Sequence, residues 1–121
     1  MGARVLLVDD ETALLQLLEQ YLKRLGFDVE SHTTALGALR SFATAPQSWR
    51  LVIADLSIPD LPSHELLRRM FELNPQLRCL LCSGTPFDVS TLPPPIGRQT
   101  AFLQKPFLPS MLSDAVQQLL A

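Results

Sequence analysis

The chain has 121 residues, of which 47% are hydrophobic, and its formal net charge is −2. This length fits one domain over residues 1–121, and the apolar content is too high for a disordered chain. Near-neutral charge without a basic run argues against direct binding of nucleic acid or of an anionic membrane. The apolar stretches are short, so we expect no signal peptide or membrane span, and a cytoplasmic protein.

Short apolar runs alternate with segments of helical periodicity along the chain. The runs predict strands at residues 5–8, 27–31, 51–54, 77–82 and 101–103. The periodic segments predict helices at residues 12–25, 35–45, 63–73 and 109–120. Gly26 suits the end of the first helix, and Ser63 is expected to cap the third. Glu11 is expected to open the first helix, where an acid favours the helix dipole.

Most of the predicted strands are apolar on both faces, and helices separate most of them. Strands of this kind belong to a parallel sheet that is covered on both sides. Because crossover connections are right-handed, we expect a doubly wound α/β fold with five parallel strands. Residues 85–99, "TPFDVSTLPPPIGRQ", hold four prolines where a further helix is expected. That helix should be short, irregular or mobile.

Two cysteines, Cys79 and Cys82, form a C-x-x-C sequence that is also seen in redox and zinc sites. They lie on a predicted strand, where three steps separate Cα atoms by about 10 Å. A disulfide needs Cα atoms within about 7 Å, and the two side chains would face opposite sides of the sheet. No second pair completes a zinc site. We therefore expect buried structural thiols.

Polar residues follow the predicted strands at one edge of the sheet. They are the acids Asp9 and Asp10, then Asp55, then Ser83 and finally Lys105. Each alone has an ordinary explanation: an acid near a helix N-terminus, an Asx turn, a self-bonded hydroxyl or a solvated lysine. Ligands of open parallel sheets, however, bind beyond the carboxyl ends of the strands, where all of these residues should meet.

Three neighbouring acids repel one another unless a cation joins them. Mg²⁺ accepts carboxylate ligands and commonly pairs with phosphate, and a lysine and a hydroxyl would suit a phosphoryl group. Ser83, the serine among these residues, has no adjacent histidine base, so the nucleophile would be a carboxylate. Asp55 stands alone on its strand end, whereas Asp9 and Asp10 form a pair suited to holding the metal.

Four motifs follow one another along the chain: "LLVDDE", "VIADLSIPDL", "LLCSG" and "FLQKPF". In this order they resemble the CheY-like receiver domain of two-component response regulators, and the resemblance covers the whole chain. It implies a flavodoxin-like three-layer sandwich with strand order 2-1-3-4-5. The residues of these motifs are most similar to those of receivers attached to hybrid sensor histidine kinases. We expect either a single-domain regulator or a receiver from a larger protein.

The resemblance also implies roles for individual residues. Asp55 would take a phosphoryl group from the phosphohistidine of a histidine kinase or phosphotransfer protein. Asp10 would bind Mg²⁺ directly and Asp9 largely through water, with Asp55 and the backbone carbonyl of Ser57 as further metal ligands. The domain would thereby catalyse its own phosphorylation and dephosphorylation in a phosphorelay, without being an enzyme for a separate substrate.

The remaining roles concern the phosphoryl group and the switch. Ser83 would bond one phosphoryl oxygen and Lys105 would pair with another. Phe102 matches the aromatic switch position, and the Lys105–Pro106 peptide is cis in the family. Ser57 and Thr85, at positions that tune dephosphorylation, are small and uncharged. The proline-rich segment alters the usual output face, so a monomer or weak homodimer is expected.

Three alternatives have distinct signatures. A receiver-like interaction module without phosphorylation usually lacks one of the key acids or the lysine, and this chain lacks none of them. A phosphatase with an aspartyl nucleophile resembles a D-x-D motif, whose second acid is replaced here by Ser57. A nucleotide-binding protein would need a G-x-G-x-x-G sequence or a P-loop, and neither is present.

Overall fold

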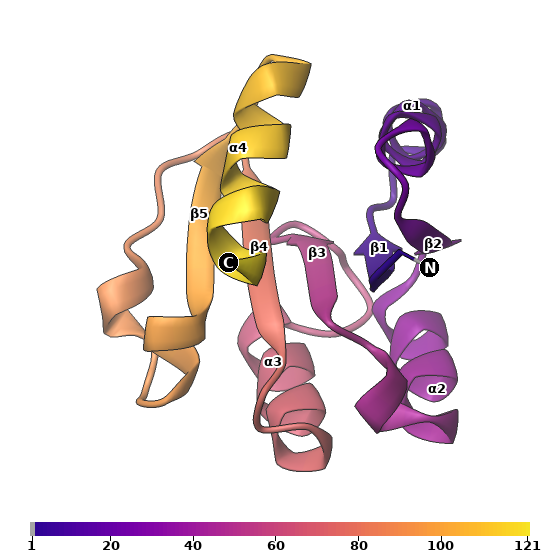
Figure 1. The fold of residues 1–121 in the computed structure, drawn as a ribbon. Coiled ribbons are helices and arrows are strands. Elements are labelled where there is room, and N and C mark those ends of the chain that lie inside the picture. The colour runs from indigo at the N-terminus through magenta and orange to yellow at the C-terminus, as the bar shows by residue number, and fades with distance from the viewer. Residues whose placement is uncertain (1) are drawn as a thin grey trace.

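A computed structural model describes residues 2–121, whose centre is a five-stranded parallel sheet (Figure 1). The strand order β2-β1-β3-β4-β5 confirms the predicted topology. The strands are β1 (Arg4–Val8), β2 (Asp28–His32), β3 (Leu51–Asp55), β4 (Arg78–Ser83) and β5 (Thr100–Gln104). Both ends of each strand lie within two residues of the predicted bounds, which is the usual uncertainty of element ends.

Four α-helices cover the sheet and complete the three layers. They are α1 (Thr12–Arg24), α2 (Ala35–Thr44), α3 (Ser63–Leu73) and α4 (Pro109–Leu120). Figure 1 shows α1 and α4 on one side of the sheet and α2 and α3 on the other. Among these residues no helix is both long and apolar enough to cross a bilayer.

Side chains alternate between the two faces of each strand and build two separate cores. Along β1, Leu6 packs with Phe42 of α2 and the α3 side, whereas Leu7 packs with Leu22 of α1 and Leu112 of α4. All of these residues are buried. The apolar character of both strand faces is therefore explained by burial on both sides.

The first helix ends as predicted. Gly26 follows the last helical turn with φ +97°, a conformation that favours glycine. The Gly26 and Phe27 amides donate to the carbonyls of Lys23 and Leu22, at 3.0 and 3.2 Å. These bonds satisfy carbonyl groups that the helix leaves without partners.

The prediction that Ser63 caps the third helix is wrong. Pro62 is the N-cap residue and Ser63 is already helical. The extended backbone of Pro62 (ψ 140°) lets its carbonyl accept from the amides of Glu65 and Leu66, both at 3.0 Å. Proline has no amide hydrogen that needs a partner, so it is suited to this position. The helix therefore begins at Ser63, one residue earlier than it would if Ser63 were the N-cap.

The proline-rich segment forms two short 3₁₀-helices, η2 (Val89–Thr91) and η3 (Ile96–Gln99), in place of an α-helix. The expectation of an irregular segment is therefore confirmed. Ile96 is buried in the same core as α2 and α3, and Phe87 and Leu92 pack against it. The segment thus covers β4 and β5 without a regular helix.

Cys79 and Cys82 are free and buried, which confirms the prediction of structural thiols. Cys79 belongs to the core beside α2 and α3, and Cys82 to the core beside α1 and α4. Burial raises the pKa of both thiols, that of Cys82 to about 12. Both sulfur atoms therefore stay protonated and inert at neutral pH.

Candidate functional site

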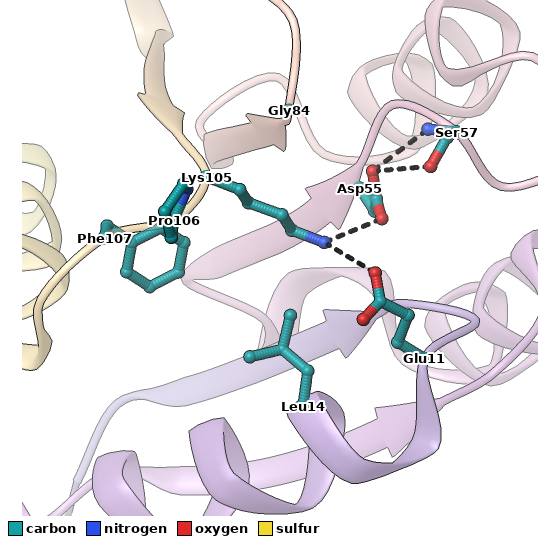
Figure 2. Close-up of a pocket in the computed structure, with 8 residues that line it drawn as sticks. All are labelled: Glu11, Leu14, Asp55, Ser57, Gly84, Lys105, Pro106 and Phe107. Atoms are coloured by element: carbon teal, nitrogen blue, oxygen red, sulfur yellow. Dashed lines mark hydrogen bonds and ion pairs between the residues drawn. The ribbon is translucent and has the colours of Figure 1, made fainter.

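A cleft of about 490 Å³ opens at the carboxyl ends of the strands (Figure 2). Its polar floor is contributed by the end of β3 and by the residues that follow β1 and β5. The lining residues are Glu11, Leu14, Asp55, Ser57, Gly84, Lys105, Pro106 and Phe107. The cleft lies where the sequence predicted convergence, at the edge on which parallel α/β sheets bind ligands.

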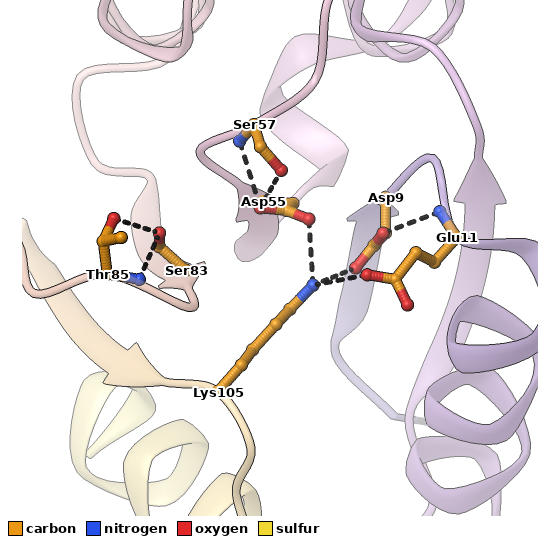
Figure 3. A network of polar contacts seen from close by, with 7 residues as sticks. All are labelled: Asp9, Glu11, Asp55, Ser57, Ser83, Thr85 and Lys105. Carbon is orange, nitrogen blue, oxygen red and sulfur yellow. Dashed lines mark hydrogen bonds and ion pairs between the residues drawn. The ribbon is translucent and has the colours of Figure 1, made fainter.

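Lys105 is the centre of the polar network (Figure 3). Its Nζ lies 2.9 Å from Asp9 Oδ2 and 2.9 Å from Asp55 Oδ2. The side chains of Asp9 and Asp55 are only 6% and 4% exposed, and that of Lys105 is 15% exposed. The ion pairs are therefore largely shielded from solvent, where charge interactions are stronger than at the surface.

Opposing effects act on the ionisation of these groups. Burial favours the neutral form of Asp55, but hydrogen bonds from Lys105 and from the Ser57 amide outweigh it and lower the pKa of Asp55. Burial also favours the neutral amine of Lys105, but its bonds to Asp55 and Asp9 outweigh that effect and raise its pKa. At neutral pH Asp55 is therefore a carboxylate and Lys105 an ammonium.

Ser57 fixes the other oxygen of Asp55. The Ser57 amide donates to Asp55 Oδ1 at 3.1 Å, and the Ser57 hydroxyl donates to the same atom at 3.0 Å. The Asp55 side chain is therefore held by Ser57 on one oxygen and by Lys105 on the other. Asp55 closes β3, and the backbone amide of Leu56 donates to the Cys82 carbonyl of β4 at 2.9 Å, which holds the start of the following loop against the sheet.

Glu11 joins the site, which the sequence interpretation missed. It is the N-cap residue of α1, as expected, but its side chain makes no capping hydrogen bond. Its Oε1 atom lies 3.9 Å from Lys105 Nζ, and its amide donates to Asp9 Oδ1 at 2.9 Å. The available signal was its position: a residue that directly follows the strand and precedes the helix sits over the strand end.

Asp10 takes no part in this group of contacts. Its side chain is exposed, whereas oxygens of Asp9, Glu11 and Asp55 lie within 4.8 Å of one another. The direct role of Asp10 in metal binding therefore stays a prediction.

The Ser83 hydroxyl bonds within its own loop. Its Oγ lies 3.1 Å from Thr85 Oγ1 and accepts from the Thr85 amide, also at 3.1 Å. Over residues 2–121, no hydrogen bond joins Ser83 to Asp55. Ser83 is nevertheless anchored near Lys105, because its carbonyl accepts from the Lys105 amide at 2.8 Å. The Lys105–Pro106 peptide is cis, as the resemblance implied.

Phe102 lies on β5, half-buried, against the core beside α2 and α3. Its ring is 6.2 Å from that of Phe87, with the planes tilted by 52°. Such a tilted pair is a favourable aromatic contact. Phe102 is therefore packed against the loop that follows Ser83.

The charges of the site fit a hard divalent cation. The three clustered carboxylates exceed the one ammonium by two negative charges. Oxygen ligands from carboxylates, with water completing the shell, are what Mg²⁺ prefers. A cation and the Lys105 ammonium together would also accommodate an incoming anion such as a phosphoryl group.

Comparison with known proteins shows which family this chain matches. The family model "Response regulator receiver domain" matches residues 5–117. The transcriptional regulatory protein CssR of Bacillus subtilis is 28% identical over 123 residues, which span 99% of this chain and 52% of CssR. The sensor kinase CckA of Brucella abortus is 27% identical over 98% of this chain and 13% of its own. The chain thus spans about half or less of these relatives' length.

A solved structure is similar throughout. The CheY-like response regulator receiver domain protein from Methanospirillum hungatei superposes with a TM-score of 0.87 at 27% identity. The alignment covers 99% of this chain and 94% of that one. The sheet order and the connections of the present chain are therefore those of that fold.

Proposed function

The chain belongs to the response regulator receiver domain family, and from this premise we propose that Asp55 accepts a phosphoryl group from the phosphohistidine of a histidine kinase or phosphotransfer protein. The observation that supports Asp55 most strongly is its position. It is a nearly buried carboxylate at the open cleft, 2.9 Å from the Lys105 ammonium. Positioning and charge neutralisation supply most of the catalysis in phosphoryl transfer.

The transfer needs one carboxylate oxygen as nucleophile. The two Ser57 donors hold Oδ1 in place, and Oδ2 is released when Lys105 turns to the phosphoryl oxygens. An Asp55 oxygen attacks phosphorus in line, and the bond from phosphorus to the imidazole nitrogen breaks. The electron pair of that bond stays on the imidazole ring, and Asp55 becomes an acyl phosphate. Hydrolysis of this acyl phosphate at the same site returns the carboxylate.

The metal would be held by Asp9, Asp10, Asp55 and the backbone carbonyl of Ser57. A bound Mg²⁺ supplies neutralisation of the charge on the transferring group. Glu11, which is close to Asp9 and Asp55, adds negative potential that attracts the cation.

The signal would pass through Ser83 and Phe102. Ser83 exchanges its bond to Thr85 for one to a phosphoryl oxygen, and Phe102 repacks as the loop after β4 moves. The altered surface then binds a different partner, which is a shift between two conformations. The similarity to the sensor kinase CckA supports a receiver that belongs to a sensor kinase, in line with the hybrid kinase expected from the motifs. We propose a cytoplasmic protein that is a monomer or weak homodimer.

An interaction module that is not phosphorylated is not favoured, since the acids, the hydroxyl and the lysine are all present. A phosphatase is not favoured because Ser57 occupies the place of the proton-donating acid.

Intact-mass spectrometry with a small phosphodonor and MgCl₂ tests the proposal. We expect one phosphoryl adduct on the wild type and none on Asp55→Asn. Asp114→Asn is a matched control, because Asp114 is an exposed residue of α4 and should leave labelling unchanged. Labelling of Asp55→Asn would refute the role of Asp55, and an unlabelled wild type would favour the interaction module.

A further inference from the structure

The loop between β3 and α3, residues 56–62, is tied to a distant helix through one side chain. Both carboxylate oxygens of Asp60 accept backbone hydrogen bonds from the first turn of α2. The Ala35 amide donates to Oδ1 at 3.0 Å and the Leu36 amide donates to Oδ2 at 2.9 Å. These two bonds lower the pKa of Asp60, so the carboxylate is ionised at neutral pH.

Asp60 and Thr34 both accept hydrogen bonds from the free amides at the N-terminus of α2. The Thr34 hydroxyl, on the N-cap residue, accepts from the Gly37 amide at 3.1 Å. Thr34 precedes the helix directly, whereas Asp60 lies 25 residues further along the chain from Ala35. Loss of either acceptor leaves helix amides without a partner, but only loss of Asp60 also releases the loop.

The same loop carries the two donors that hold one oxygen of Asp55. Ser57, three residues before Asp60, donates twice to Asp55 Oδ1. Between them, Ile58 is buried in the core and fixes the middle of the loop. Among the hydrogen bonds of residues 2–121, those of Asp60 are the ones that join this loop to α2. The chain from Asp55 to Pro62 is thus held at its start by the sheet and near its end by α2.

We propose that Asp60 is a positioning residue for phosphotransfer, which clamps the loop to α2 so that Ser57 keeps its donors on Asp55 and its carbonyl at the metal position. This inference rests on the proposed function. It makes α2, which contributes no side chain to the cleft, a determinant of the geometry at Asp55. The arrangement gives the loop the fixed support that a preorganised site requires.

The test compares Asp60→Ala and Asp60→Asn with Thr34→Ala, which weakens the same helix end without touching the loop. Four quantities are measured on each full chain: the urea midpoint, the exchange rate of the Ser57 amide, Mg²⁺ affinity, and the rate of labelling by a small phosphodonor. We expect Asp60→Ala and Thr34→Ala to lower the urea midpoint comparably. Of these two variants, only Asp60→Ala should speed exchange at Ser57 and weaken Mg²⁺ binding and labelling, by about tenfold, the lower end of the range for a lost outer-shell contact.

Asp60→Asn keeps one acceptor oxygen, so it should fall between the wild type and Asp60→Ala in all four quantities. It also serves if Asp60→Ala fails to fold. The inference is overturned if the Asp60 variants match Thr34→Ala in Ser57 exchange, Mg²⁺ affinity and labelling. If the wild type takes no label, the proposed function itself is overturned, and the inference about Asp60 with it. A labelled wild type with Asp60 variants that match Thr34→Ala overturns the inference alone.

Discussion

Among single residues, Lys105 decides the charge balance of the cleft. Its ammonium is the cation that contacts both Asp9 and Asp55, whose side chains are almost inaccessible to solvent. Buried carboxylates without a partner lower the stability of the fold. Lys105 compensates this cost for Asp9 and Asp55, but its single charge does not balance all the carboxylates of the cluster. The same excess of negative charge is what would attract Mg²⁺.

Replacing Lys105 by methionine should therefore destabilise the fold in a pH-dependent manner. At pH 7 we expect the free energy of unfolding to fall by about 3 kcal/mol, because Asp9 and Asp55 lose their buried partner. In the wild type the lowered pKa of Asp55 stabilises the fold above the unfolded pKa, and this contribution is lost as pH falls through the folded pKa. In the variant the pKa of Asp55 is no longer lowered by Lys105.

The gap between wild type and Lys105→Met should accordingly be large at pH 7 and shrink near pH 4 and below, as carboxylates protonate. Urea unfolding at the two pH values measures it. Lys23→Met is the control, because that exposed surface lysine pairs with Glu19 on the same helix and should change stability by less than about 0.5 kcal/mol. A gap independent of pH would contradict the charge explanation.

Thr85 determines where the Ser83 hydroxyl rests. Replacing it by valine keeps the shape but removes the hydroxyl that lies 3.1 Å from Ser83 Oγ. With that competitor gone, Ser83 is freer to bond a phosphoryl oxygen, so the acyl phosphate should persist longer, by about threefold, while stability changes by less than about 1 kcal/mol. The decay of the labelled mass measures this. Ser83→Ala should not lengthen the lifetime, and equal lifetimes in wild type and Thr85→Val would reject the competition.

At the scale of elements, the segment between β4 and β5 differs most from a regular alternation of strands and helices. Residues 89–91 and 96–99 form 3₁₀-turns, and apolar side chains of the segment still reach the core. The Phe87–Phe102 contact joins this segment to β5. The segment is thus fastened by a few side chains instead of by a helix face.

Phe87→Ala should therefore loosen the segment without blocking phosphorylation. Loss of the aromatic pair and of partly buried area should cost about 2 kcal/mol of unfolding free energy. Leu73→Ala is the control, since Leu73 is among the exposed apolar residues and should cost under about 1 kcal/mol. Chemical denaturation and the intact-mass assay measure the two effects. Unlabelled Phe87→Ala that remains folded would show that the aromatic contact is part of the acceptor site.

Elements with strong periodicity were predictable, whereas contacts between loops were not. The third and fourth α-helices have the predicted bounds, Ser63–Leu73 and Pro109–Leu120, because their apolar spacing and flanking prolines are local signals. The role of Pro62 as N-cap depended on backbone angles that the residue type does not fix. The bonds from Asp60 to α2 depended on tertiary structure, because the partners lie far apart in the chain.

For the candidate site, the sequence placed Asp9, Asp55, Ser83 and Lys105 at one edge, because parallel strands end together there. It did not reveal that Glu11 reaches Lys105 or that Ser83 bonds Thr85. Both depend on side-chain direction over distances of a few ångströms, which strand order alone does not determine.

At the scale of the whole molecule, the sheet separates two independent cores. Cys79 and Cys82 lie three positions apart on β4 and belong to opposite cores. Their reactivity therefore reports on the integrity of both sides at once.

We expect neither thiol to react with a thiol reagent in the native state except through unfolding. Labelling should speed up in urea in parallel with loss of circular dichroism, since only the thiolate reacts and burial raises both thiol pKa values. Cys79→Ala and Cys82→Ala assign the two signals. Rapid native labelling of either cysteine would contradict the packing on its side of the sheet.

The central claim, that Asp55 is the phosphoacceptor, is tested most directly by locating the acyl phosphate. Treating the phosphorylated chain with borohydride reduces the acyl phosphate to the alcohol, so the modified aspartate becomes homoserine, which tandem mass spectrometry locates in the peptide. The predicted result is homoserine at position 55, dependent on the phosphodonor and on Mg²⁺. Homoserine at Asp9, Asp10 or Asp60, or none after confirmed phosphorylation, would contradict the claim.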